Sequence, residues 1–207
     1  MSRIEVEELI GKGYSCNVFL VRSSRNFLID AGIDSVQRII EAAEETSIDR
    51  IILTHRHVDH VADAEDLSEK LDAPIYAPLE EAEALRSGDD RTVLGSTFGR
   101  KLPPMEVNDL TESEYSGFQI LKTPGHTEGS ISLYHPDNKI LFSGDTVFSH
   151  GSVGRTDLPT GDREELLGSV KTLSDLDVDS LYPGHMSPVS KGADKHILLA
   201  KKHLKYM

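Results

Sequence analysis

The sequence predicts an α/β fold in which two mixed β-sheets are flanked by helices. Short apolar runs typical of strands recur along the chain, and helix-like runs lie between the later ones. Each half of the chain opens with three strand-like runs and then alternates between helices and strands. Two mixed sheets packed together, with the helices outside, satisfy this pattern.

In the first half, the opening strands follow one another through short turns, as the strands of hairpins do. Ser35 has a side chain suited to capping the first helix. The strands are expected at residues 4–10, 17–21, 27–30, 51–54 and 74–77, and the helices at residues 35–45, 62–71 and 79–86.

The second half repeats this scheme, and Asp162 is the expected N-cap of its first helix. The segment 87–116 between the halves is irregular, and either a loop that covers the substrate or a surface excursion would account for it. The strands of the second half are expected at residues 118–122, 130–134, 139–143 and 178–182, and the helices at residues 163–173 and 194–204.

Length and composition favour one globular domain that spans residues 1–207, with 38% hydrophobic and 28% charged residues. No apolar run approaches the roughly 20 residues that a membrane span needs. The N-terminal residues contain no apolar signal region, so we expect a cytoplasmic protein without a membrane partner.

The net charge of −13 argues against nonspecific binding of nucleic acid, which usually requires a basic surface. A small-molecule substrate is therefore expected, and the sequence gives no indication of the oligomeric state. The single cysteine, Cys16, cannot form an intramolecular disulfide and lies in an apolar segment. We expect it to be a small buried side chain and not a nucleophile.

The segment from Thr54 to His60 contains three histidines and an aspartate between an expected strand and an expected helix. Imidazole and carboxylate groups are ligands that zinc and similar divalent metals prefer. In an extended segment, His55 and His57 point to the same side and can share one metal. Where the chain turns into a helix, Asp59 and His60 can point towards a second metal.

Three further candidate ligands each follow an apolar strand and adjoin a glycine that permits a sharp turn. They are His126 in Thr-Pro-Gly-His-Thr, Asp145 in Ser-Gly-Asp-Thr and His185 in Tyr-Pro-Gly-His. The recurrence of strand, glycine turn and ligand indicates one shared site.

These side chains suffice for two metals, most simply two zinc ions, with iron or manganese as alternatives. A hydroxide between the metals would complete their coordination, and such metals typically lie about 3.5–4 Å apart. The predicted ligands are His55, His57 and His126 for one metal, Asp59, His60 and His185 for the other, and Asp145 as the bridge. We expect His135, His196 and His203 to be structural or solvated, whereas His150, near Asp145, is ambiguous.

The four motifs, in the order Thr-His-x-His-x-Asp-His, Pro-Gly-His-Thr, Ser-Gly-Asp-Thr and Pro-Gly-His, resemble the metallo-β-lactamase superfamily. The resemblance spans about residues 14–190. It implies an αββα sandwich with the metals at one edge between the sheets, and it implies ligand roles for the same seven residues. A histidine at position 57, where the flavodiiron branch has a glutamate, is unlike that branch.

The stretch that follows Asp145, from Gly151 to Pro159, resembles the glyoxalase II-like hydrolases. Within it, Arg155 and Asp157 are expected to form a local ion pair that holds the loop beside Asp145. The longer glyoxalase II enzymes have a C-terminal helical region that supplies much of their glutathione site, and this chain ends soon after His185. The resemblance therefore leaves recognition of glutathione open.

The leading hypothesis is a dinuclear metal-dependent hydrolase that cleaves a small thioester or ester through a metal-bridging hydroxide. Asp59 would be both a ligand and a proton shuttle. The Gly-Arg-Thr-Asp sequence around Arg155 also occurs in mononuclear-iron persulfide dioxygenases, so such an enzyme is an alternative. A single iron would use only some of the seven predicted ligands, which makes this alternative less favoured. A lactonase with the same dinuclear site is a further alternative. A purely structural metal site is disfavoured, because such sites are closed and commonly rich in cysteine.

Overall fold

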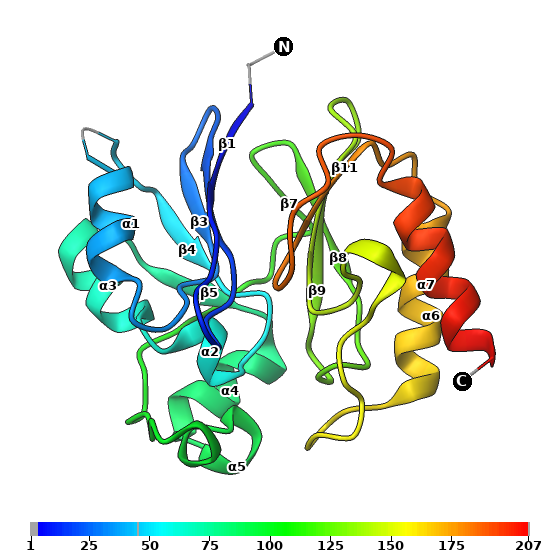
Figure 1. Ribbon diagram of the computed structural model, residues 1–207. Coiled ribbons are helices and arrows are strands. Elements are labelled where there is room, and N and C mark those ends of the chain that lie inside the picture. The colour runs from blue at the N-terminus through cyan, green and yellow to red at the C-terminus, as the bar shows by residue number, and fades with distance from the viewer. Residues whose placement is uncertain (1–3, 45, 207) are drawn as a thin grey trace. The chain divides into compact units, whose positions relative to one another are not determined.

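The computed structural model describes residues 4–44 and 46–206, and it divides into two compact units, Met1–Thr111 and Glu112–Met207. Each unit contains one mixed β-sheet with its own helices and its own hydrophobic core (Figure 1). The predicted fold class, with two mixed sheets and flanking helices, is confirmed.

The first unit contains a six-stranded sheet in the order β1-β2-β3-β4-β5-β6. The first three strands pair antiparallel and the remaining pairs are parallel. Because parallel neighbours end at the same edge, residues that follow these strands gather there. The strands are β1 (Glu5–Leu9), β2 (Val18–Arg22), β3 (Phe27–Ile29), β4 (Arg50–Ile52), β5 (Ile75–Ala77) and β6 (Asn108–Asp109).

Helices α1 and α3 contact each other and lie side by side in this unit (Figure 1). Buried side chains such as Ile39 of α1 and Leu67 of α3 form one core with Leu28 and Ile51 of the sheet. The helices of this unit are α1 (Val36–Ala42), α2 (Val58–Val61), α3 (Ala64–Leu71), α4 (Leu79–Ser87), α5 (Asp90–Val93) and the 3-10 helix η1 (Ser96–Phe98).

The second unit contains a five-stranded sheet in the order β11-β10-β9-β8-β7, in which only β10 and β11 pair parallel. Its strands are β7 (Glu114–Tyr115), β8 (Phe118–Lys122), β9 (Ile131–His135), β10 (Ile140–Gly144) and β11 (Ser180–Pro183). Its helices are η2 (Ser149–Gly151), α6 (Arg163–Ser174) and α7 (Asp194–Tyr206).

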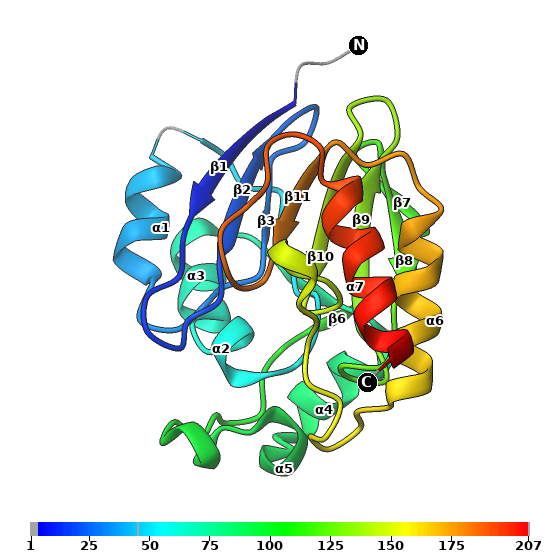
Figure 2. The ribbon, with the colours of Figure 1, turned by 45° about the vertical axis from the view of Figure 1, so that its right-hand side comes forward.

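Helices α6 and α7 pack side by side against this second sheet (Figure 2). Leu166 and Val170 of α6 and Ile197 of α7 are buried with Leu141 and Leu181 of the sheet. The predicted N-cap of α6 is confirmed, because the Asp162 side chain accepts hydrogen bonds from the first free amides of that helix, those of residues 164 and 165.

Three details differ from expectation. Ser35 occupies the N-cap position of α1, but its hydroxyl donates to the carbonyl of Ile33 and does not cap the helix. The helix expected at residues 62–71 is α3, preceded by the separate short helix α2, and the end expected at residue 45 lies outside the described residues. Residues 87–116 contain short elements where only irregular chain was expected.

Within the described ranges, no helix combines the length and apolar character that crossing a bilayer requires.

Candidate metal centre

Strand β4 ends at Ile52 and α2 begins at Val58, so the histidine-rich segment spans the change from strand to helix, as predicted. His57 has extended backbone angles at the N-cap of α2, with φ −62° and ψ 142°. The ring centroids of His55 and His57 are 4.8 Å apart, and those of His55 and His60 are 4.0 Å apart. Three buried imidazoles thus gather at one edge of the first sheet.

Helix α2 carries the other two candidate ligands of this segment. The side chain of His60 is fully buried, whereas the side chain of Asp59 is 15% exposed. Nε2 of His60 lies 4.0 Å from Oδ2 of Asp59. This separation is too long for a hydrogen bond, but it is of the order that two ligands of one metal ion require.

A hydrogen-bond chain fixes which nitrogen of two of these histidines carries the proton. The hydroxyl of Thr54 donates to the Asp30 carboxylate at 2.9 Å, so it accepts the bond from Nδ1 of His55 at 3.1 Å. Nδ1–H of His60 donates to Oδ2 of Asp30 at 2.8 Å. With Nδ1 protonated in both rings, the free lone pair of each lies on Nε2, which is the form that binds a metal.

Asp30 was not among the predicted site residues. It follows β3 and has a left-handed backbone, with φ 61°, and the amide of Thr54 also donates to its carboxylate, at 2.7 Å. The sequence contained a signal that could have identified it, because Ile29-Asp30-Ala31-Gly32 repeats the pattern of a strand end, an aspartate and a nearby glycine.

A buried ion pair holds the segment between the first two histidines. The guanidinium of Arg56 contacts both carboxylate oxygens of Glu81, at 2.8 and 2.9 Å, and the amide of Arg56 donates to the same carboxylate at 2.7 Å. Glu81 lies on α4 and is fully buried. This bidentate contact fixes the backbone that presents His55 and His57.

Cys16 lies against the same histidine cluster, and its burial agrees with the prediction. Its thiol, one oxygen of Asp30 and one ring nitrogen of His60 lie within 4.8 Å of one another. Burial raises the pKa of the Cys16 thiol to about 12, so it remains protonated at neutral pH. Burial and this raised pKa agree with the prediction of a small buried side chain that is not a nucleophile.

The second unit brings its three predicted ligands together around Asp145. Nε2 of His126 lies 3.5 Å from Oδ2 of Asp145, and Nε2 of His185 lies 3.6 Å from the same oxygen. Both nitrogens therefore face the oxygen predicted to bridge the metals. His126 and Asp145 are buried, and His185 is partly exposed beside the ring of Phe148.

The loop after Asp145 holds His126 by its backbone. Nδ1–H of His126 donates to the carbonyl of Arg155 at 2.7 Å, and the amide of Gly154 donates to the carbonyl of Asp145 at 3.0 Å. Arg155 and Asp157 form the expected ion pair, with contacts of 2.9 and 2.7 Å. Arg155 lowers the pKa of Asp157 to about 2, so the pair remains charged at neutral pH.

The remaining histidines have structural contacts. The ring of His135 packs edge-on against Phe118, with centroids 4.9 Å apart. Nδ1 of His196 accepts a hydrogen bond from the amide of His150 at 2.7 Å, and Nδ1–H of His203 donates to the carbonyl of Gly151 at 3.0 Å.

The donor set fits divalent metals. His55, His60 and His126 each have Nδ1 held by an oxygen acceptor, which orients Nε2 as the ligand atom. The other available donors are imidazole nitrogens and carboxylate oxygens, which suit zinc, iron and manganese. A site with this chemistry can activate water and polarise a carbonyl group when metals are bound.

The sequence matches the profile of the metallo-beta-lactamase superfamily over residues 11–185. A probable metallo-hydrolase of Methanocaldococcus jannaschii is 40% identical over 191 residues, which cover 86% of this chain and 91% of that protein. The hydroxyacylglutathione hydrolase GloC of Haemophilus influenzae is 30% identical, with 93% of this chain and 94% of that protein covered.

Among solved structures, TTHA1623 in a di-iron-bound form superimposes with a TM-score of 0.78 at 31% identity. The match covers 91% of this chain and 96% of that one. The family profile, the relatives and the fold agree with the four ligand motifs of the sequence. This chain therefore belongs to the metallo-β-lactamase superfamily.

Proposed function

We propose that this protein is a dinuclear metal-dependent hydrolase that cleaves a small thioester or ester. One observation carries the proposal: three of the candidate histidines have Nδ1 anchored to an oxygen acceptor, so that Nε2 is the ligand atom. All three are buried and lie in the ligand motifs, so their Nε2 atoms are held within the candidate site. Membership of a superfamily that contains metallo-hydrolases supports the same interpretation.

The proposed ligands are those predicted from the sequence. His55, His57 and His126 serve one metal, and Asp59, His60 and His185 serve the other. Asp145 is the shared ligand, which is consistent with the two histidine nitrogens that face its Oδ2 within the second unit. Zinc is the first candidate metal, and the di-iron form of a 31% identical protein makes iron the second.

When bound, such metals lower the pKa of water towards neutrality and polarise the substrate carbonyl. The protein supplies orientation and proton transfer. Asp30 and the carbonyl of Arg155 hold the imidazoles of His60 and His126 in one tautomer. The partly exposed carboxylate of Asp59 is the proposed proton shuttle, because its side chain retains contact with solvent.

The thioester assignment is supported by the glyoxalase II-like loop after Asp145 and by the name of the Haemophilus relative, which is matched over 94% of its length. The Arg155–Asp157 pair in that loop faces solvent, and its backbone holds His126. We therefore assign these two residues to support of the metal site and not to contact with the substrate.

The proposal is tested with protein loaded separately with zinc, iron or manganese. Four quantities are measured together: metal content per chain, hydrolysis of S-lactoylglutathione and simpler acyl thioesters, hydrolysis of lactones, and oxygen uptake with a persulfide. Two metals per chain with thioester hydrolysis and no oxygen uptake is the expected result. One iron per chain with oxygen uptake would establish the dioxygenase, and hydrolysis of lactones alone would establish the lactonase.

The Asp145→Asn variant is the matched test of the site, with Asp137→Asn in an exposed turn as its control. We expect the first variant to lose metal and hydrolysis while it stays folded, and the second to keep both. If Asp145→Asn unfolds while metal-free wild-type protein is also unfolded, the metals are structural and the hydrolase proposal fails.

A further inference from the structure

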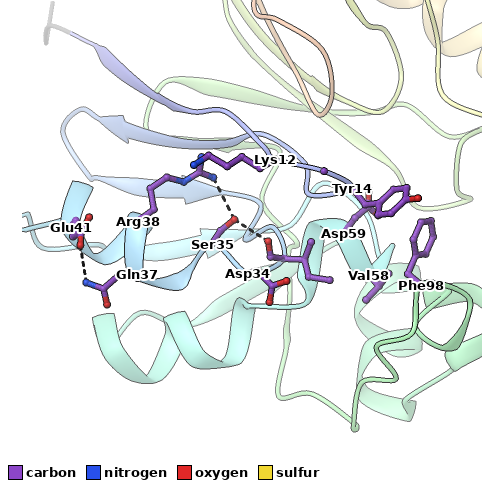
Figure 3. Close-up of a pocket in the computed structure, with 12 residues that line it drawn as sticks. Lys12, Tyr14, Asp34, Ser35, Gln37, Arg38, Glu41, Val58, Asp59 and Phe98 are labelled. Carbon is purple, nitrogen blue, oxygen red and sulfur yellow. Dashed lines mark hydrogen bonds between the residues drawn. The ribbon is translucent and has the colours of Figure 1, made fainter.

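A cavity of about 690 Å³ lies in the first unit and reaches one of the proposed ligands (Figure 3). Its lining comes from the turn after β1, from residues 33–35, from α1 and from α2, where it includes Asp59. Phe98 of η1 completes the lining. A volume of this size suits a small-molecule ligand, and its contact with Asp59 connects it to the proposed chemistry.

Two exposed aromatic rings form one wall of this cavity. Tyr14 is 75% exposed and Phe98 is 42% exposed, yet their centroids are only 5.6 Å apart in an edge-to-face arrangement. Large aromatic side chains that pair with each other while facing a cavity are suited to cover a flat or apolar ligand group.

Two cations line the cavity away from this aromatic wall, as Figure 3 shows for Lys12 and Arg38. Among the described residues, Lys12 forms no ion pair. Arg38 donates to the uncharged carbonyls of Leu9 and Ile10 and, in the same described ranges, forms no ion pair.

The three acidic groups of the lining have other contacts or roles, and one of them, Asp59, is a proposed metal ligand. Asp34 pairs with Arg100 at 2.7 Å, and Glu41 accepts a hydrogen bond from the Gln37 amide at 2.9 Å. Lys12 and Arg38, which form no ion pair within the described part of the chain, are therefore the groups of this cavity that can bind an anionic ligand group.

We infer that this cavity binds the carboxylate-bearing part of the substrate. The carboxylate contacts Lys12 and Arg38, and a flat or apolar segment covers Tyr14 and Phe98. The scissile carbonyl then lies beside Asp59, a placement that rests on the proposed function. The substrate class is therefore a thioester or ester that carries a carboxylate beyond an apolar spacer.

Two pairs of aryl thioesters test this inference. In one pair the leaving thiol is 4-mercaptobenzoate or its carboxamide, each acetylated on sulfur. In the other pair the acyl group is a benzoyl group with a para carboxylate or carboxamide, each as the S-methyl thioester. Within each pair, the kcat/KM of the carboxylate divided by that of the carboxamide measures selection of the carboxylate. Comparing this ratio between protein variants cancels the difference in intrinsic reactivity between the two substrates.

The variants are Lys12→Met, Lys12→Glu and Tyr14→Ala, with Lys70→Met on the exposed face of α3 as the matched control. In at least one pair, we expect Lys12→Met to lower the ratio by about 3- to 10-fold, as for one partly exposed ion pair. Lys12→Glu should lower it further, and Lys70→Met should leave it unchanged. Tyr14→Ala should lower kcat/KM for both members of a pair by the same factor.

A binding measurement separates failure of this inference from failure of the proposed function. Calorimetry compares 4-(methylsulfanyl)benzoate with its carboxamide, and neither compound is hydrolysed. Binding of the carboxylate that weakens in Lys12→Met supports the cavity even if no thioester is turned over. Equal ratios in wild type and Lys12→Met for both pairs, or equal binding of the carboxylate by these two proteins, would overturn the inference while thioester hydrolysis still stands.

Discussion

The carboxylate of Asp30 accepts a hydrogen bond from Nδ1–H of His60 at 2.8 Å. The same carboxylate accepts from the amide and the hydroxyl of Thr54, and that hydroxyl in turn accepts from His55. One side chain outside the ligand motifs therefore fixes the tautomer of two proposed ligands. Because each of its oxygens accepts from a different partner, a single carbonyl oxygen cannot replace it.

We expect the Asp30→Asn variant to bind metal about 10- to 100-fold more weakly than wild type. The new amide group offers one acceptor where two are needed, and its NH₂ group would face a donor of Thr54 or of His60. The affinity is measured by competition with a chromophoric chelator. The control is Asp49→Asn, which changes an exposed aspartate of the same unit. Equal affinity in the Asp30 variant and the control would contradict the assigned role.

The buried Arg56–Glu81 pair predicts an asymmetry between single and double substitutions. Glu81→Met leaves the guanidinium buried without its acidic partner, so the free energy of unfolding should fall by about 3–5 kcal/mol. Arg56→Met/Glu81→Met removes both charges and should lie much closer to wild type. Urea unfolding of the metal-free proteins measures the difference. A double variant less stable than Glu81→Met would show that the pair itself stabilises the fold.

The sequence allowed the ligand motifs to be predicted because each is local. A strand end, a glycine and a ligand lie within a few residues of one another, as in Gly125-His126 and Gly144-Asp145. The supporting contacts join residues that are distant in the sequence. Asp30 is 30 residues from His60, and Glu81 is 25 residues from Arg56. Only the folded chain shows these pairs, although Asp30 carried the local pattern.

Long-range contacts also explain why Ser35 does not cap α1 as predicted. Serine is a residue type that favours the N-cap position. Here, however, the amide of Ser35 donates to the Asp63 carboxylate, and its hydroxyl donates to the carbonyl of Ile33 in the preceding turn. The segment 87–116 was expected to cover the substrate or to be a surface excursion, and it supplies only Phe98 to the cavity. Most of the lining comes from the turn at Lys12, from residues 33–35 and from α1, where no sequence motif indicated a binding role.

Cys16 should resist alkylation in the folded protein. Its side chain is fully buried, and burial raises its thiol pKa to about 12, so both access and thiolate are lacking at pH 8. Iodoacetamide should label it only after unfolding in urea, and mass spectrometry counts the modification. Rapid labelling in native buffer, at a rate similar to that in urea, would contradict the buried placement.

Gly154 is one of the positions where the second unit should not tolerate a side chain. A Cβ atom there would lie 2.1 Å from the carbonyl oxygen of Asp145 and 2.7 Å from Nδ1 of His126. Gly154→Ala must therefore move the loop, and we expect this shift to weaken the bond between His126 and the carbonyl of Arg155. We expect a loss of about 1–3 kcal/mol in the free energy of unfolding, together with weaker metal binding.

The matched control for Gly154→Ala is Gly168→Ala, in helix α6. A Cβ atom at residue 168 meets no other atom within 4 Å, so the alanine adds helix propensity without a clash. This variant should gain roughly 0.5–1 kcal/mol in stability and keep wild-type metal affinity. Urea unfolding and chelator competition on both variants test the pair. If Gly154→Ala behaved like Gly168→Ala in both measurements, the loop would not be what positions His126.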